Sequence, residues 1–127
     1  GDCGGVVTCQ TDLGFAGPGA ASLSFCGGDL STGTTADLDL VGAAPNATAF
    51  LFISLTNAPT AAKGGTLVPV PPLAQVALTT SASGEILIPG LPGGGGPVTV
   101  FVQYVIVDGS QTQGFAFSNA LEVQYLP

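Results

Sequence analysis

Glycine and proline interrupt this chain so often that a long helix cannot form in it. The 127 residues include 20 glycines and 10 prolines, and both residue types disfavour helix interiors. No window places apolar residues at helical spacing, whereas turn-forming residues recur about every 8–12 residues, which is typical of a β-sandwich. Since the length suits one domain, we expect a single all-β domain.

Between the turns, apolar and polar residues alternate with the two-residue period of β-strands. Residues 49–55 form a denser apolar run, which indicates a strand buried on both faces, and Ser118–Asn119 marks a bulge or kink in the last strand. We predict an antiparallel, Ig-like β-sandwich of about seven to nine strands over residues 20–127, preceded by a glycine-rich segment, residues 1–19. The expected strands cover residues 21–26, 36–41, 49–55, 65–70, 75–79, 85–88, 98–108 and 115–125.

The chain is almost uncharged. Lys63 is its one basic residue, it has no arginine or histidine, and eight carboxylates give a formal net charge of -7. Nucleic acids and anionic membrane surfaces are bound through clustered lysine and arginine, so both partners are excluded. The longest apolar run, residues 98–107, is too short for a transmembrane helix of roughly 20 residues, so no membrane insertion is predicted. So little charge gives little repulsion between copies, which favours packing or polymerisation.

The side chains that move protons near neutral pH are missing. A serine or cysteine nucleophile needs a neighbouring base, usually histidine, and the sequence contains no histidine. Lys63 lies among small residues without a recognisable motif. No Lys-Ser/Thr pair follows the glycine run at residues 93–96, so a phosphate-binding loop is not expected there. We predict that the protein is not an enzyme.

Asp37 and Asp39 are the candidate metal ligands. They are two residues apart in an expected strand, so both side chains project from one face. Such a pair can bind Ca²⁺ with help from backbone carbonyls. It could also be a carboxylate dyad of the glycosidase type, or a solvated strand face opposite Leu38 and Leu40. No cofactor other than calcium is predicted.

Three cysteines are present, Cys3, Cys9 and Cys26, at spacings unlike those of a zinc site. Cys9 and Cys26 flank a stretch rich in glycine and proline, and a disulfide closing this loop of about 17 residues would contribute on the order of 3 kcal/mol. We predict this disulfide, with Cys3 free or bonded between chains. Three reduced, buried cysteines are the alternative. A disulfide indicates an exported protein.

Short motifs are spread over nearly the whole chain, at Cys9–Phe15, Gly17–Gly19, Ala44–Ala47, Gly65–Pro71, Ser83–Gly84, Val102–Tyr104 with Asp108, and Gly114–Leu121. Together they resemble a β-sandwich module found in secreted proteins of planctomycetes and similar bacteria. The resemblance implies an Ig-like sandwich, export to the extracellular space or cell surface, and no known enzymatic activity. It also implies the pairing of Cys9 with Cys26, while Cys3 is additional to the pattern.

Two classes of function follow. The first is an extracellular structural protein, a subunit that assembles with copies of itself into a filament, fibre or surface coat. Natural sheets protect their edges with lysines, inward charges or bulges, and this chain has one lysine. A strand donated by another copy would cover an edge. The expected donor is the N-terminal segment, with Cys3, Val6, Val7 and Thr8 as candidate intermolecular residues; the segment could equally fold back on its own domain.

The second class is a monomeric accessory module at the cell surface that binds carbohydrate or calcium. Binding pockets for small molecules commonly use aromatic side chains, but the chain has no tryptophan and only two tyrosines. Of these, Tyr104 lies on the apolar face of its strand and is expected in the core. The mass of the protein in solution would separate the two classes.

Overall fold

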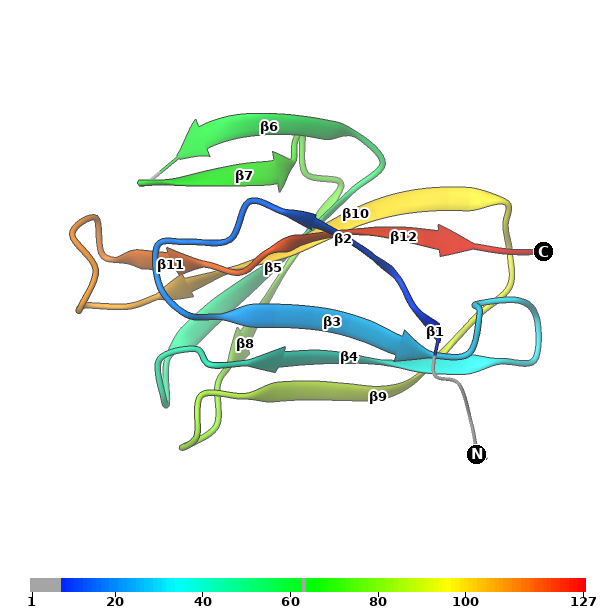
Figure 1. The fold of residues 1–127 in the computed structure, drawn as a ribbon, viewed down its shortest axis with the longest axis horizontal. Coiled ribbons are helices and arrows are strands. Elements are labelled where there is room, and N and C mark those ends of the chain that lie inside the picture. The colour runs from blue at the N-terminus through cyan, green and yellow to red at the C-terminus, as the bar shows by residue number, and fades with distance from the viewer. Residues whose placement is uncertain (1–7, 63) are drawn as a thin grey trace.

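The computed structural model describes residues 8–62 and 64–127, whose arrangement is shown in Figure 1. The described residues form strands β1 to β12 and no helix, and every strand pairing is antiparallel. Accordingly, this part of the chain holds no helix that could cross a membrane. The prediction of an all-β chain is confirmed. The described strands outnumber the expected ones because β1, β2 and β6 were not expected and because the last expected strand, residues 115–125, is divided into β11 and β12.

Four strands form the first sheet, in the order β1–β3–β4–β9. In that order they span Thr8–Cys9, Ser22–Gly27, Thr35–Val41 and Ile86–Pro92. The alternation expected from the sequence is present, since Leu23 and Phe25 of β3 and Leu38 and Leu40 of β4 are buried. One face of this sheet therefore supplies one side of the core.

The second sheet has the order β2–β12–β10–β5–β8, and β11 pairs with the far end of β10. The strands span Thr11–Gly14, Ala120–Tyr125, Val98–Val107, Thr48–Ser54 and Ala74–Thr79 in that order, with β11 at Phe115–Phe117. β10 is central and is rich in the β-branched and aromatic residues that strands favour. Its inner face carries Val102, Tyr104 and Ile106, all buried.

The core lies between these two sheets. Its buried cluster draws on β3 and β4 of the first sheet and on β5, β10 and β12 of the second. The largest fully buried side chains include Tyr104, Leu40, Ile106 and Leu121, which come from both sheets. The expected core position of Tyr104 is therefore confirmed.

The last expected strand is interrupted at Ser118–Asn119, where the sequence predicts a bulge or kink. β11 ends at Phe117 and β12 begins at Ala120. Between them, Asn119 reaches across to the first sheet: its Oδ1 accepts the N–H of Leu23 at 2.7 Å, and its Nδ2 donates to the Leu23 carbonyl at 2.9 Å. The interruption thus ties the two sheets together.

A separate ribbon of β6 (Asn57–Ala62) and β7 (Gly65–Pro69) lies against the outer face of the second sheet (Figure 1). The buried side chain of Gln103 anchors it. Its Oε1 accepts the Val68 N–H at 2.9 Å, and its Nε2 donates to the carbonyls of Thr66 and Ser118. The strand expected at residues 65–70 is therefore present, but it pairs with β6 and not with a main sheet.

The N-terminal segment belongs to the fold from Thr8 onward. β1 pairs with β3 of the first sheet and β2 with β12 of the second, so the chain crosses between the sheets at Gln10. The Gln10 N–H donates to the Phe25 carbonyl at 2.9 Å, and its Oε1 accepts the Gln124 N–H at 2.9 Å. Residues 8–14 thus fold back on their own domain, and a boundary after residue 19 does not set them apart from the sheets.

Candidate functional site

The edges of the two sheets differ in how open they are to an added strand. The first sheet ends in β1 and β9, and the second in β2 and β8. In the part of the chain that the structure describes, β1 has two residues, and β2 carries Asp12, whose Oδ1 accepts the Gly14 N–H at 2.8 Å. Short edge strands and charged side chains both hinder strand addition in natural proteins, so this side of the molecule is protected.

β9 is protected in another way. It contains Pro89 and Pro92, which have no N–H to donate to an added strand, and its register with β4 shifts between Ala36 and Leu38. The N–H of Gly90 is already bonded, because it donates to a carboxylate oxygen of Asp37 at 2.9 Å. A strand approaching β9 would therefore find few free main-chain partners.

β8 has none of these protections. Its sequence, Ala-Gln-Val-Ala-Leu-Thr, contains no charge, proline or glycine, and it pairs with β5 residue for residue without a register shift. No other described strand pairs with its outer side. Val76 of β8 is 42% exposed, and Leu73 just before it is 68% exposed. A regular, uncharged and uncovered edge strand is a template for pairing with another chain.

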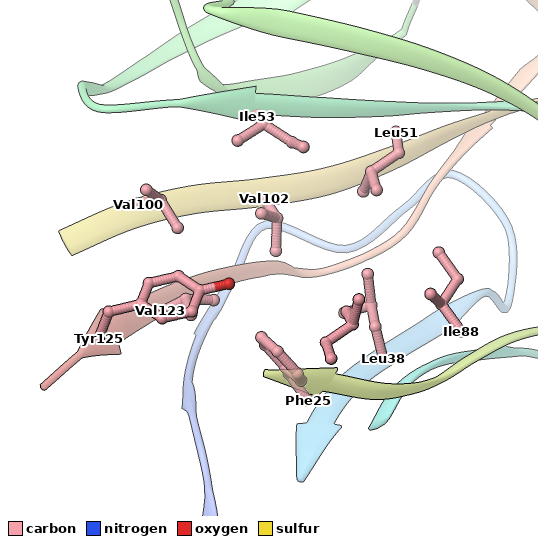
Figure 2. Close-up of a pocket in the computed structure, with 10 residues that line it drawn as sticks. Phe25, Leu38, Leu51, Ile53, Ile88, Val100, Val102, Val123 and Tyr125 are labelled. Carbon is pink, nitrogen blue, oxygen red and sulfur yellow. The ribbon is translucent and has the colours of Figure 1, made fainter. Parts of the chain in front are cut away.

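An apolar cavity of about 250 Å³ lies between the two sheets (Figure 2). Figure 2 shows side chains of both sheets pointing toward one another around it. Five side chains of its lining are only partly buried, namely Ile53, Ile88, Leu91, Val100 and Tyr125. Its full lining is Phe25, Leu38, Leu51, Ile53, Ile88, Leu91, Val100, Val102, Val123 and Tyr125.

Two tyrosines have shifted pKa values. Burial raises the pKa of Tyr104 to about 12, and its hydroxyl has no hydrogen-bond partner among the described residues. Burial also raises the pKa of Tyr125, whose hydroxyl points toward the cavity in Figure 2. Both side chains therefore stay neutral near pH 7, and Tyr125 gives the cavity lining its one hydroxyl.

A second apolar cavity, of about 240 Å³, lies beneath the β6–β7 ribbon on the outer face of the second sheet. Gly65 allows this close approach, because a Cβ there would lie 2.5 Å from a ring carbon of Phe117. Gln75 of β8 is the polar residue of a lining that consists of Phe50, Phe52, Ala62, Leu67, Gln75, Val105, Phe115 and Phe117. Four of the nine aromatic residues of the chain thus lie under the ribbon, next to Gln75 of β8.

The structure places Asp37 and Asp39 on the outer face of β4, as their spacing predicts. Asp37 accepts the N–H of Gly90, and Asp39 pairs across the sheet with Ser24 and Leu87. The described residues bring together no group of three or more His, Cys, Asp or Glu side chains that could hold a metal ion. A calcium ion at this pair would depend on backbone carbonyls, and its binding stays a prediction.

Cys9 and Cys26 form a disulfide between directly opposed positions of β1 and β3, with a Cα–Cα distance of 4.0 Å. The predicted pairing is therefore present. Thr8, which the sequence suggested as an intermolecular residue, pairs with Gly27 of its own chain. The other candidate intermolecular residues, Cys3, Val6 and Val7, lie outside the described residues, as does Lys63.

The glycine run at residues 93–96 uses its amides inside the protein. The N–H of Gly93 donates to the Thr34 carbonyl at 2.8 Å. The N–H of Gly94 donates to the Leu30 carbonyl at 2.7 Å. These amides hold the β9–β10 loop against the β3–β4 loop, so they do not form a cradle for phosphate.

Sequence reasoning predicted poorly protected edges but not which edge is open. The signal was present in residues 74–79, an uncharged β-prone stretch between Pro71–Pro72 and the turn at residues 81–84. That this stretch lies at an edge depends on its pairing with β5, which joins residues far apart in the sequence. The cavity also escapes sequence reasoning, because it depends on how two sheets meet.

No protein-family model matches the chain, and no curated protein and no solved structure matches it significantly. The resemblance to a secreted bacterial module therefore stays a prediction. The edge of β8 and the cavity between the sheets are the features on which a function can be argued.

Proposed function

We propose that this chain is an extracellular structural protein whose copies assemble through their sheet edges into a filament, fibre or surface coat. The observation that carries the proposal is β8, a regular and uncharged strand whose outer side no described strand covers. Its free main-chain groups can be satisfied by a strand of another molecule, as in other complexes formed by β-augmentation. No enzymatic activity is part of this proposal.

The charge of the chain supports assembly. With one basic residue and a net charge of -7, ion pairs between copies can contribute little. The contact must then rest on main-chain hydrogen bonds and on apolar burial, which stabilises by roughly 25 cal/mol per Å². Since salt screens only charges, the assembly is expected to be insensitive to ionic strength.

The strand order supports an Ig-like topology. Seven strands taken in chain order, β3, β4, β5, β8, β9, β10 and β12, place the first, second and fifth in one sheet and the third, sixth and seventh in the other. The immunoglobulin constant arrangement divides these strands in the same way but puts its fourth strand beside the fifth. Here the fourth strand, β8, joins the opposite sheet beside β5. The strand whose position differs is thus the one with the open edge.

An assembly that grows needs a second contact besides β8. A contact between unlike surfaces that does not close on itself makes a filament. We propose the residues that precede β1 for this second contact, with Val6 and Val7 for apolar burial and Cys3 for a bond between chains. Residues 8–14 are excluded from this role because they pair with their own sheets.

The disulfide supports an extracellular location. Disulfides persist in oxidising compartments and are rare in the cytosol, and the Cys9–Cys26 bond joins two strands of this fold. A structural protein outside the cell benefits from a covalent tie, since no chaperone or metabolic energy maintains its fold there.

The deciding experiment is the mass of the purified protein in solution, measured by light scattering at low and high salt over a wide concentration range. The proposal expects a mass above that of the 12.4 kDa chain, rising with concentration and unchanged by salt. A monomer at every concentration in both salts would refute it.

The apolar cavity favours a second candidate, a monomeric surface module that binds a small apolar ligand. Ligand sites are typically apolar with few polar groups, and this cavity combines apolar walls with the hydroxyl of Tyr125. It favours an acyl or aromatic group over the carbohydrate expected from the sequence. Decanoic acid should then raise the melting temperature of the protein, and Val100→Phe, which fills the cavity, should remove that effect. No shift with decanoic acid would dismiss this candidate.

A further inference from the structure

We infer that two copies of this chain pair directly through β8, strand against antiparallel strand, with Ala77 on the two-fold axis. This inference rests on the proposed self-assembly and names its partner, a second copy joined through the same strand. In the described part of the chain, β1 is too short, β2 is charged, and β9 contains two prolines. Since β8 is the one open edge among the described strands, a pairing of sheet edges joins β8 of one copy to β8 of the other, which is an isologous contact.

The direction of the main-chain groups of β8 follows from its bonds to β5. The N–H of Thr80 donates to the Ala47 carbonyl at 2.8 Å, so it points toward β5. Along a strand, the N–H and C=O groups of successive residues point to opposite sides. Because the pairing with β5 is regular from residue 74 to 79, Val76 and Leu78 also direct their groups to β5.

The central strand leads independently to the same result. The N–H of Ser118 donates to the Tyr104 carbonyl at 3.0 Å, so Tyr104 faces away from β5. Its neighbours Gln103 and Val105 must then bond β5 at residues 52 and 50. This leaves Leu51, between those two, to bond β8 at Val76.

Gln75, Ala77 and Thr79 therefore direct their N–H and C=O groups to the open side. With Ala77 on the axis, Ala77 faces Ala77 of the other copy, and Gln75 faces Thr79. Every outward N–H of one copy then meets an outward carbonyl of the other. An axis through Val76 would place Gln75 opposite Ala77 and would leave Thr79 opposite Leu73, whose N–H is already bonded to the Ile53 carbonyl at 2.7 Å. The axis through Ala77 thus satisfies more main-chain groups.

The side chains fit this register. On the inner face, the half-exposed Val76 would lie beside Leu78 of the other copy. Apolar surface that is exposed in a single copy is then buried in the pair. On the outer face, Gln75 lies beside Thr79, and no charged side chains oppose each other in β8. Like charges directly opposite would be destabilising. The result is a closed pair with one continuous sheet running through both copies.

Cysteine cross-linking tests the register. Residues that face each other in a hydrogen-bonded pair have Cα atoms about 5.5 Å apart, within the roughly 4.4–6.8 Å range of disulfides. In a Cys3→Ser background, Ala77→Cys should give a disulfide-linked dimer under mild oxidation. Ala77 is small and exposed, so the variant should fold like the parent.

Gln75→Cys is the matched control, since residue 75 lies on the same strand and the same face and is also exposed. In the proposed register, the two copies of residue 75 are four residues apart along the strands, roughly 13 Å, so this variant should stay monomeric on a non-reducing gel. Equal cross-linking by both variants, or by Val76→Cys in place of Ala77→Cys, would overturn the pairing. If the parent chain assembles but Ala77→Cys does not cross-link, the β8 pairing is wrong while the proposed function stands. If the parent chain is monomeric throughout, the proposed function fails as well.

Discussion

The two sides of this sandwich are built differently. On the side of β1 and β2, the disulfide ties β1 to β3, Gln10 contacts both sheets, and Asn119 bonds across to Leu23. On the side of β8 and β9, no described side chain makes a comparable tie, and apolar side chains such as Leu73 and Leu87 are exposed. We call these the tied side and the open side.

The difference shows how an almost uncharged chain manages its edges. Lysine is a common guard of edge strands, but the described residues of this chain contain none. In place of lysine, β9 has two prolines and a register shift against β4, and β2 has a register shift against β12. The described part of β1 is only two residues long. β8 is left without any of them, so its openness stands out against three protected edges.

The largest effect is expected from Asn119→Ala on the tied side. Its amide holds both the N–H and the C=O of Leu23, and each buried group left without a partner costs about 1–3 kcal/mol. We expect the free energy of unfolding to fall by about 4 kcal/mol in denaturant titrations. Ser24→Ala, an exposed change on the same β3 strand, should alter it by less than about 0.5 kcal/mol. Equal losses in the two variants would show that the hydrogen bonds of Asn119 to Leu23 do not stabilise the fold.

Removing the disulfide should weaken the tied side almost as much. The bond closes a loop with a sequence separation of 17 residues, and a loop of this length stabilises by about 3 kcal/mol. The double variant Cys9→Ser with Cys26→Ser should lose about that much free energy of unfolding. Association through β8 should persist in the double variant at temperatures where it stays folded, and its loss there would contradict the independence of the two sides.

Tyr104 reports on the core between the two sides. Its pKa of about 12 in the fold lies above the ordinary value of about 10, so the fold favours the neutral phenol. The resulting stability is fully present below about pH 10 and is lost as the pH rises to about 12, at roughly 1.4 kcal/mol per pH unit. Unfolding curves at several alkaline pH values should show this slope. Tyr104→Phe should reduce this slope. An unchanged slope in the variant would show that another group causes the pH dependence.

A substitution in β8 on the open side should weaken the association of two copies without changing the stability of the single chain. Val76→Lys puts a charge on the half-exposed inner face of β8, as natural edge strands do, and we expect the dissociation constant of the pair to rise at least tenfold, which is about 1.4 kcal/mol. Leu87→Lys is the matched variant on the protected β9 edge. It should leave the dissociation constant unchanged, and sedimentation measurements that show equal losses would erase the distinction between the edges.

The smallest effect is expected inside the cavity. Val100→Ile adds one carbon to a side chain that lines it, and burying one such group is worth about 0.8 kcal/mol. A rise of roughly 0.5–1 kcal/mol in the free energy of unfolding would identify real empty space between the two sheets. A fall would show that the lining is already packed.

Sequence reasoning predicted the parts of the fold that depend on local pattern. The alternation in residues 21–26 and 36–41 predicted β3 and β4, and the break at Ser118–Asn119 was read correctly. The position of β8 at an edge was not predictable, because the alternation of Gln75 to Thr79 would suit a central strand as well. The burial of Gln103 was missed too, since its partners lie 15 to 37 residues away in the chain.

The disulfide between β1 and β3 also decides how the protein would carry a mechanical load. β2 lies antiparallel to the last strand, with Thr11 opposite Glu122, so a pull on the two chain ends would act to peel β2 away from β12 one bond at a time. Cys9 precedes β2, and its bond passes the load directly to Cys26 near the end of β3. Residues 10–25 are thereby shielded from tension. A subunit pulled by its neighbours would resist extension at its N-terminal end until the sheet that contains β3 itself gives way.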